Sequence, residues 1–203
     1  ETASPQPVVV FENDALLDYR ARRPVISFDQ DHLTEFTPPR LELSLATDAL
    51  GRPFLLLAGY EPDFAWNLFA NTVLALAAEF EISGLHWVHS IAMPVPHTRP
   101  IGTTVSGNRR ELTVAHSVWR PRTQVPATAG HLLEFRFVER GDRAVGFVLL
   151  VPHYLAETEN PDAVIAAAER LMASTGLVLM LDAVQERRED YLTRVDEQVA
   201  GND

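Results

Sequence analysis

The sequence predicts an α/β fold, and three observations support this prediction. Two apolar runs, at residues 85–92 and 144–151, have the composition of strands buried on both faces, as in a parallel sheet covered by helices. From residue 53 onwards, candidate strands and helices alternate along the chain. A strong helix start then follows the second run at Asn160-Pro161-Asp162, where a capping side chain precedes a proline and an acidic residue.

The first fifty residues indicate short strands separated by turns. A β-branched run at 7–11 predicts a strand, and a short helix is expected over 13–22 with Asn13 or Asp14 as its cap. Three further strands are predicted at 24–29, 33–36 and 40–45. Since turn residues separate them, we interpret residues 24–47 as a β-hairpin arm.

The remaining elements follow from apolar spacing and from capping residues. A helix is expected from Asp63 to about Phe80. Residues 108–130 are rich in turn formers, including Pro121 and Pro126, and no element is assigned there. Residues 130–139 fit a helix or a strand equally well. The other predicted elements are strands at 54–59, 85–92, 103–105 and 144–151 and helices over 161–175 and 182–199.

Composition narrows the range of partners. The 203 residues carry a net charge of −11 with a pI near 5.0, so a nucleic acid, which requires a basic surface, is not an expected partner. All 17 basic residues are arginine, which excludes lysine-based Schiff-base chemistry. The sequence contains no cysteine and no apolar stretch long enough to span a bilayer. We therefore expect a cytoplasmic protein without a membrane partner.

Two segments of the chain end alike, at Val95-Pro96-His97 and Val151-Pro152-His153. Each follows one of the apolar runs, and its proline is expected to end the strand because proline has no N–H for the ladder. A histidine is thus placed just past the carboxyl end of each strand, the edge where open α/β sheets bind ligands. We predict that the two strands are parallel neighbours and that the two histidines line one concavity.

The candidate ligand-binding residues all follow apolar strands, so they are expected to face one crevice: Glu61, His97, Thr98, Arg99, His153 and Tyr154. Histidine can transfer a proton near neutral pH, and the Arg99 guanidinium matches the oxygens of a carboxylate or phosphate. The alternative is structural: the two histidines bond to loop backbone and Arg99 pairs with Glu61. The residue types leave both interpretations open.

The sequence indicates no metal site and no cofactor. His86 and His89 form an H-x-x-H pair, but residues three apart on a strand point to opposite faces and cannot hold one ion. Neither glycine-rich nucleotide-binding loop occurs. Ser90 lacks the flanking glycines of a hydrolase nucleophile elbow.

The chain resembles the proteasome-assembly-chaperone-two family, in its actinobacterial branch. The resemblance extends from about residue 13 to residue 199 and rests on motifs in a fixed order: LLDYRARRP at 16–24, GYEPD at 59–63, VPHTRP at 95–100, VPHYLA at 151–156 and Asn160-Pro161. It implies a three-layer α/β core, a sheet with helices on both faces like that of nucleoside phosphorylases and some hydrolases. It also implies a hairpin used in oligomer contacts, often trimeric, and a C-terminal helical segment over a ligand pocket.

From this resemblance we expect one α/β domain over residues 1–180, with the arm inside it, and a C-terminal helical segment over 181–203. The family usually opens with a strand, a glycine-rich turn and a helix, which find no match here; the expectation is that this first strand and helix are absent. The predicted function is a non-catalytic ligand-binding or protein-assembly module that forms a homo-oligomer, with a protein partner and a small anionic ligand as candidates.

The alternative function is an enzyme that acts on a small anionic metabolite by hydrolysis or phosphorolysis. In that mechanism His97 or His153 is the general acid–base, Glu61 orients it, and Arg99 holds the anion. The sequence contains no complete catalytic motif that would choose between the two functions.

Overall fold

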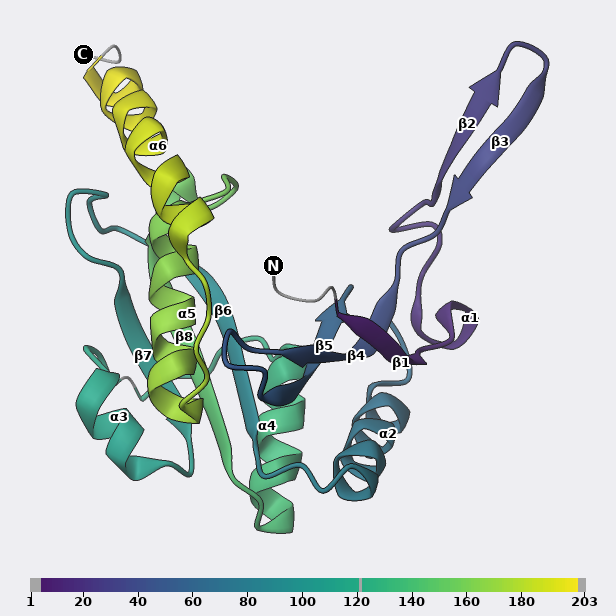
Figure 1. The fold of residues 1–203 in the computed structure, drawn as a ribbon, viewed down its shortest axis with the longest axis horizontal. Helices are drawn as coiled ribbons and strands as arrows, with labels where there is room; N and C mark the ends of the chain where they lie inside the picture. The colour runs from purple at the N-terminus through teal and green to yellow at the C-terminus, as the bar shows by residue number, and fades with distance from the viewer. Residues whose placement is uncertain (1–4, 121, 201–203) are drawn as a thin grey trace. The chain divides into compact units, whose positions relative to one another are not determined.

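The computed structural model describes residues 5–120 and 122–200. The chain divides into two compact units, and each is described by itself (Figure 1). The first comprises Glu1–Ile82 and Ala127–Leu133, and the second comprises Ser83–Pro126 and Glu134–Asp203. Pro121, a predicted turn residue, and the last three residues of the predicted C-terminal segment lie outside the described residues. Both units combine helices with small sheets, so the predicted α/β class is confirmed.

An antiparallel sheet of order β1-β4-β5 forms the centre of the first unit. Its strands are β1 (Gln6–Val10), β4 (Leu41–Thr47) and β5 (Pro53–Gly59). Strand β4 has buried residues on both faces, and its Leu41, Leu43 and Ala46 belong to the core of this unit. Helix α2 (Trp66–Glu79) contributes Phe69, whose ring meets that of Phe11 edge-on at 5.2 Å.

The first two helices differ from the predictions because Asp63 has other partners. Its carboxylate accepts a hydrogen bond from the Asp18 backbone N–H at 2.8 Å and pairs with the Arg22 guanidinium at 2.7 Å. It therefore does not cap α2, which begins at Trp66 after Ala65 in the left-handed region (φ 53°). The predicted helix over 13–22 is a single turn, α1 (Asn13–Leu16), because the chain beyond it is held by carboxylates instead of by helical hydrogen bonds.

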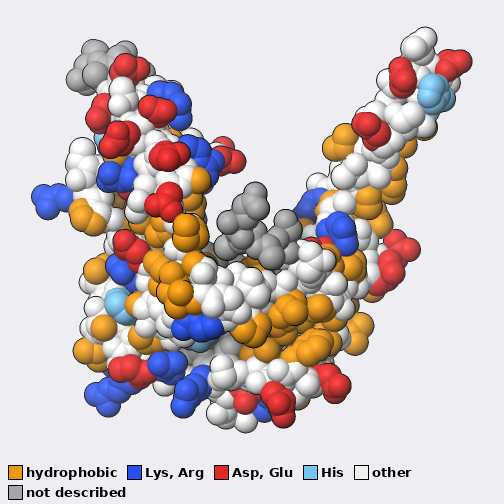
Figure 2. All heavy atoms as spheres, viewed as in Figure 1, with side chains coloured by type: hydrophobic (Ala, Val, Ile, Leu, Met, Phe, Trp, Pro, Cys, Tyr) orange, Lys and Arg blue, Asp and Glu red, His pale blue; other side chains and the backbone are white. Residues whose placement is uncertain are grey.

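Strands β2 (Val25–Asp29) and β3 (His32–Thr37) form an antiparallel hairpin, and among the strands of the described residues each pairs only with the other. Large apolar side chains are exposed along it, as the space-filling view shows (Figure 2). The third strand predicted within the arm is β4, which pairs with β1 and β5 because its apolar side chains are buried there. The exposed hairpin, defined here as residues 25–37, is thus shorter than the predicted arm.

The second unit contains a sheet of order β6-β8-β7. Its strands are β6 (Leu85–Met93), β7 (Gly102–Gly107) and β8 (Ala144–Pro152). Strand β8 runs parallel to β6 and antiparallel to β7, so the two apolar runs are parallel neighbours as predicted. One detail of the prediction is wrong: β6 ends at Met93, because Pro94 already interrupts the ladder, and Val95-Pro96-His97 lies in the following loop.

Helices lie against both faces of this sheet. On one face, Leu149 and Val151 pack on Ala166 of α5 (Pro161–Thr175). On the same face, Val145 and Phe147 pack on Leu112 of α3 (Arg110–His116), a helix within the segment left unassigned. On the other face, Gly146 lies beneath Glu134 of α4 (Ala129–Arg140). The segment 130–139, which fitted a helix or a strand equally well, is thus part of a helix.

Helix α5 begins and ends where the sequence predicts. The Asn160 side chain accepts hydrogen bonds from the backbone N–H groups of Asp162 and Ala163 at 3.1 and 3.3 Å. Gly176, in the left-handed region (φ 76°), ends the helix. An extended segment then leads to α6 (Asp182–Ala200). Within the described ranges 5–120 and 122–200, none of the helices has the length and apolar character needed to cross a membrane.

His86 and His89 point to opposite faces of β6, as predicted. His86 lies opposite Val145, on the face that α5 covers, and its Nδ1 is 3.0 Å from the Ser174 hydroxyl. His89 lies on the other face, where its ring stacks on Trp87 with centroids 4.9 Å apart. The two imidazoles therefore cannot bind one metal ion.

Burial, and then the charge of Arg109, lower the pKa of His86 below its ordinary value. The unfolded chain thus binds a proton at His86 more readily than the folded protein, and stability should be lost as the pH falls through the ordinary histidine pKa. We expect thermal unfolding to move to lower temperature between about pH 7 and about pH 5. His86→Gln, which keeps an acceptor for Ser174, should reduce this dependence; an unchanged dependence would contradict the role of His86.

Candidate functional site

Two segments meet at the carboxyl edge of the β6-β8-β7 sheet. The parallel register places Met93, the end of β6, opposite Pro152, the end of β8. The loop 94–101 follows β6, and a short 3-10 turn, η1 (His153–Leu155), follows β8. The two histidines of the Val-Pro-His segments are therefore at the same edge of the sheet, as predicted.

The His97 ring is held at both nitrogens. The Tyr154 hydroxyl accepts a hydrogen bond from the His97 backbone N–H at 2.8 Å and lies 2.8 Å from the ring Nδ1. On the opposite side, Nε2 is 2.9 Å from a carboxylate oxygen of Asp196 in α6. The side chain is only 11% exposed. Because the tyrosine accepts the backbone N–H, its own proton can be donated to Nδ1, which leaves Nε2 as the donor to Asp196.

This arrangement has a chemical consequence. A general acid–base needs a ring nitrogen within hydrogen-bond reach of the substrate. Here Tyr154 and Asp196 occupy both nitrogens, so His97 must break a hydrogen bond before it can exchange a proton with a bound molecule. The geometry supports an anchoring role, in which His97 joins the loop, η1 and α6.

Tyr154 also contacts the second histidine. The His153 and Tyr154 rings meet edge-on with centroids 5.3 Å apart, and the His97 and Tyr154 rings do so at 5.9 Å. His153 is exposed and lies outside the cavity described below. Thr98 and Arg99 are exposed in the loop and line that cavity.

Glu61 is the predicted site residue that belongs to the first unit. Its carboxylate accepts a hydrogen bond from the Ala129 backbone N–H at 2.6 Å, at the first residue of α4. A carboxylate at this position accepts a hydrogen bond from an N–H group that has no partner within the helix, and it interacts favourably with the positive end of the helix dipole. Glu61 thus has a structural task, and across the described ranges no ion pair joins it to Arg99.

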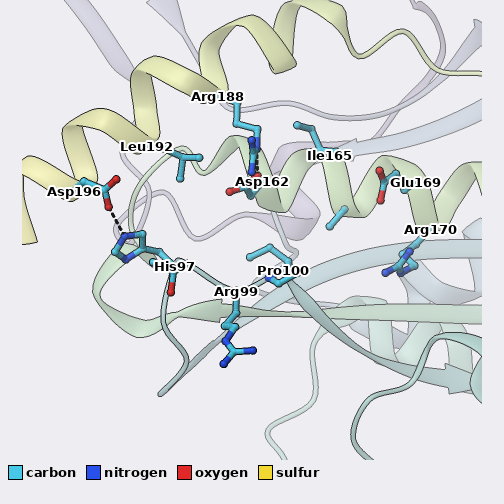
Figure 3. Close-up of a pocket in the computed structure, with 13 residues that line it drawn as sticks. His97, Arg99, Pro100, Asp162, Ile165, Glu169, Arg170, Arg188, Leu192 and Asp196 are labelled. Atoms are coloured by element: carbon cyan, nitrogen blue, oxygen red, sulfur yellow. Dashed lines mark hydrogen bonds and ion pairs between the residues drawn. The ribbon is translucent and has the colours of Figure 1, made fainter.

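Helix α6 packs on the segment after β8. Tyr191 and Val195 are buried against Leu155, and the Tyr191 and Thr158 hydroxyls are 2.8 Å apart. A hydrogen bond between His97 and Asp196 and an ion pair between Arg188 and Asp162, at the first turn of α5, add to these contacts (Figure 3).

A cavity of about 400 Å³ lies between the loop, α5 and α6. Its lining contains four basic side chains, His97, Arg99, Arg170 and Arg188, and three acidic ones, Asp162, Glu169 and Asp196. The remainder is mostly apolar. His97 and Arg188 have carboxylate partners within the lining, whereas Arg99 and Arg170 have no ion pair among the residues that the structure describes (Figure 3).

Sequence reasoning missed the residues that α5 and α6 contribute. Asp196 is 99 positions away from His97, and no local pattern connects the two. Residues 188, 191, 192, 195 and 196 share one face of α6 by helical spacing, which was a usable sign that this face packs on another element. It did not indicate which element.

Removal of the Asp196 carboxylate should loosen α6. We expect Asp196→Asn to increase hydrogen exchange of the α6 amides, because His97 Nε2 loses its charged acceptor. The loss of global stability should stay below about 1 kcal/mol, since the carboxylate is 69% exposed. Asp190→Asn, at an exposed position of the same helix, is the control. Equal exchange in both variants would show that the pair does not hold α6.

Removal of the Glu61 carboxylate should destabilise the fold. Glu61→Ala leaves the Ala129 N–H without its acceptor, and the free energy of unfolding in urea should fall by about 1 kcal/mol. Glu79→Ala, at an exposed position of α2, is the matched control. If Glu61→Ala and the control unfold at the same urea concentration, the structural role of Glu61 is refuted.

Comparison with known proteins places the chain in a family. The sequence profile of the PAC2 family matches residues 1–199. A search of curated proteins gave no match. Among solved structures, the chain is similar to protein Rv2714 of Mycobacterium tuberculosis, of unknown function, with 39% identity and a TM-score of 0.92 over 98% of this chain and 69% of that one.

Two further structures are similar. A protein of unknown function from Corynebacterium glutamicum has 31% identity and a TM-score of 0.92, over 98% of this chain and 74% of that one. The proteasome-assembly chaperone homologue Rv2125 of Mycobacterium tuberculosis shares the fold, with 24% identity and a TM-score of 0.88 over 97% and 84% of the two chains. From the profile match and the identity to the first two structures, the chain belongs to the PAC2 family.

Proposed function

We propose that the protein is a non-catalytic protein-assembly module that associates with further copies of itself through the β2–β3 hairpin. The observation that carries this proposal is the apolar face of the hairpin, which no other described element covers. An isolated two-stranded hairpin is marginally stable in water, so a hairpin of this kind requires a partner.

The apolar side chains gather on one face of the hairpin. Phe28 and Leu33 lie directly opposite each other in the ladder, and Ile26 points to the same side as Phe28. Glu35, in the left-handed region (φ 51°), lies at an irregularity in the register, so Phe36 also points to this side. Phe28 is 70% exposed and Phe36 is 61% exposed.

The opposite face is polar apart from Val25, the first residue of β2. Ser27 and Thr34 are paired there, Asp29 lies opposite His32, and the Ser27 hydroxyl donates to the Glu35 carboxylate at 3.0 Å. The hairpin therefore has one face for burial and one for solvent, together with two strand edges that can accept further strands.

A second copy of the chain is the partner that fits this face best. Four large apolar side chains at the centre of a contact are typical of permanent homo-oligomers, whose interfaces are more apolar than those of transient complexes. Most soluble oligomers are also assemblies of identical chains. We expect three copies, as the family resemblance implies, and the name of the chaperone homologue Rv2125 supports an assembly function. The complete three-layer, phosphorylase-like core and the cytoplasmic location stay predictions.

The alternative, an enzyme acting on a small anion, has less support. Its proposed orienting group, Glu61, bonds the start of α4, and its proposed acid–base, His97, has both ring nitrogens occupied. His153 packs on Tyr154 outside the cavity. The acid–base and orienting residues that this mechanism requires are thus engaged in other contacts.

The oligomer should dissociate when the apolar face of the hairpin is charged. We expect the protein to sediment as an oligomer at micromolar concentration, and Phe28→Asp to raise the dissociation constant at least about 30-fold. Since Phe28 is exposed in the single chain, the variant should fold, which circular dichroism checks.

Thr34→Asp is the matched control, because it places the same charge on the polar face of the same hairpin. It should sediment like the unmodified protein. A monomer in the unmodified protein, or equal dissociation of both variants, would refute the proposal.

A further inference from the structure

Helix α3 and the residues that follow it present an exposed apolar surface of their own. Val114, Val118 and Trp119 are all exposed, Val118 by 70%. Single exposed apolar side chains are ordinary, but large ones gathered in one short segment are typical of a contact surface. In Figure 2, apolar and basic side chains lie next to one another over α3.

The backbone of this surface is held in place by β7. The Val118 N–H donates a hydrogen bond to the Thr103 carbonyl at 2.8 Å. The Thr104 hydroxyl donates to the Trp119 carbonyl at 3.1 Å. Since both bonds tie the segment after α3 to a strand of the sheet, its apolar side chains are displayed in a fixed arrangement, which reduces the entropy lost when a partner binds.

The same surface is basic. Arg110 lies four residues before Val114 and thus on the same face of α3. The Arg120 guanidinium donates to the Thr113 carbonyl at 3.3 Å, which brings it to the last turn of that helix. Neither arginine forms an ion pair with any other residue that the structure describes. The α3 surface is defined here as Arg110, Val114, Val118, Trp119 and Arg120.

The charge of this region is opposite to that of the chain as a whole. Between Glu81 and Glu134 the sequence contains five arginines and one acidic residue, so this stretch has a net charge of +4. The whole chain has a net charge of −11. The one acidic residue is Glu111, and it pairs with Arg109. The α3 surface therefore fits a partner that combines an apolar face with negative charge.

The β2–β3 hairpin has both of these properties. Residues 25–37 contain Asp29, Asp31 and Glu35 and no arginine, so their net charge is −3. All three acidic residues are exposed and lie outside the apolar face, two on the polar face and Asp31 in the turn. They can thus form a charged rim around an apolar contact. Two hairpins placed against each other would instead bring like charges together.

We propose, on the basis of the self-association proposed above, that the hairpin of one copy docks on the α3 surface of another copy. The apolar face of the hairpin packs on Val114, Val118 and Trp119, and its acidic rim lies near Arg110 and Arg120. The contact is heterologous, because two different surfaces of the same chain meet. Each copy thus has one surface to give and one to receive, which allows assemblies of more than two copies.

A charge on the α3 surface should weaken the oligomer. We expect Val118→Asp to raise the dissociation constant in sedimentation experiments at least about tenfold, because it places a carboxylate within the apolar contact and beside the acidic rim. Arg110→Glu is a second variant, at an exposed position, and should weaken the oligomer for the electrostatic reason alone. Val164→Asp, at an exposed position of α5, is the matched control and should sediment like the unmodified protein. Circular dichroism checks that each variant is folded.

A mixture of two defective variants tests the pairing itself. Phe28→Asp has a damaged hairpin and an intact α3 surface, and Val118→Asp has the reverse. At a concentration where each alone is monomeric, an equimolar mixture should form a dimer, because one intact hairpin can dock on one intact α3 surface. A mixture that stays monomeric, or an oligomer that Val118→Asp leaves unchanged, would overturn this contact while self-association through the hairpin stands. A monomeric unmodified protein would overturn both.

Discussion

Strand β8 pairs along its whole length with β6 on one edge and over residues 145–150 with β7 on the other, and this pairing determines where the candidate site lies. Eight of its nine residues are buried. Two close approaches depend on glycine. A Cβ on Gly107 would overlap the Ala144 backbone, and one on Gly146 would overlap both the Glu134 carboxylate and the Trp87 indole. Because the strands are packed this tightly, the end of β6 and the end of β8 have a fixed register, and the segments after them share one edge of the sheet.

This constraint explains which features the sequence could predict. A strand buried on both faces is a nearly continuous apolar run, so β6 and β8 were recognisable, and two parallel neighbours place their following residues together. The start of α5 was predictable because Asn160, Pro161 and Asp162 each favour a helix start for a local reason. The opposite orientation of His86 and His89 likewise follows from strand geometry alone.

Features that depend on competition between distant groups were not predictable. Asp63 has the sequence context of a helix cap, yet the Asp18 N–H and the Arg22 guanidinium bind its carboxylate instead. Glu61 follows a strand, as a ligand-binding residue would, but it accepts a hydrogen bond from Ala129, 68 positions further along. In both cases a carboxylate has several possible partners, and the choice among them is made by tertiary structure.

Competition for hydrogen-bond partners also distinguishes the side chains of the candidate site. Some of them anchor the fold, and others keep donors without a partner in the fold. Histidine and arginine were both chosen from the sequence for their chemistry, but their contacts differ. His97 is fixed by Tyr154 and Asp196, so its hydrogen-bonding capacity is already used. Arg99 and Arg170 keep N–H groups that no described carboxylate accepts. A side chain whose bonds are satisfied within the fold contributes to stability, whereas one left with unsatisfied donors in a cavity is available to a ligand. On this basis, His97 contributes to stability by holding loop 94–101, η1 and α6 together at the edge of the sheet, whereas the buried Nε of Arg170 has no acceptor among the described residues.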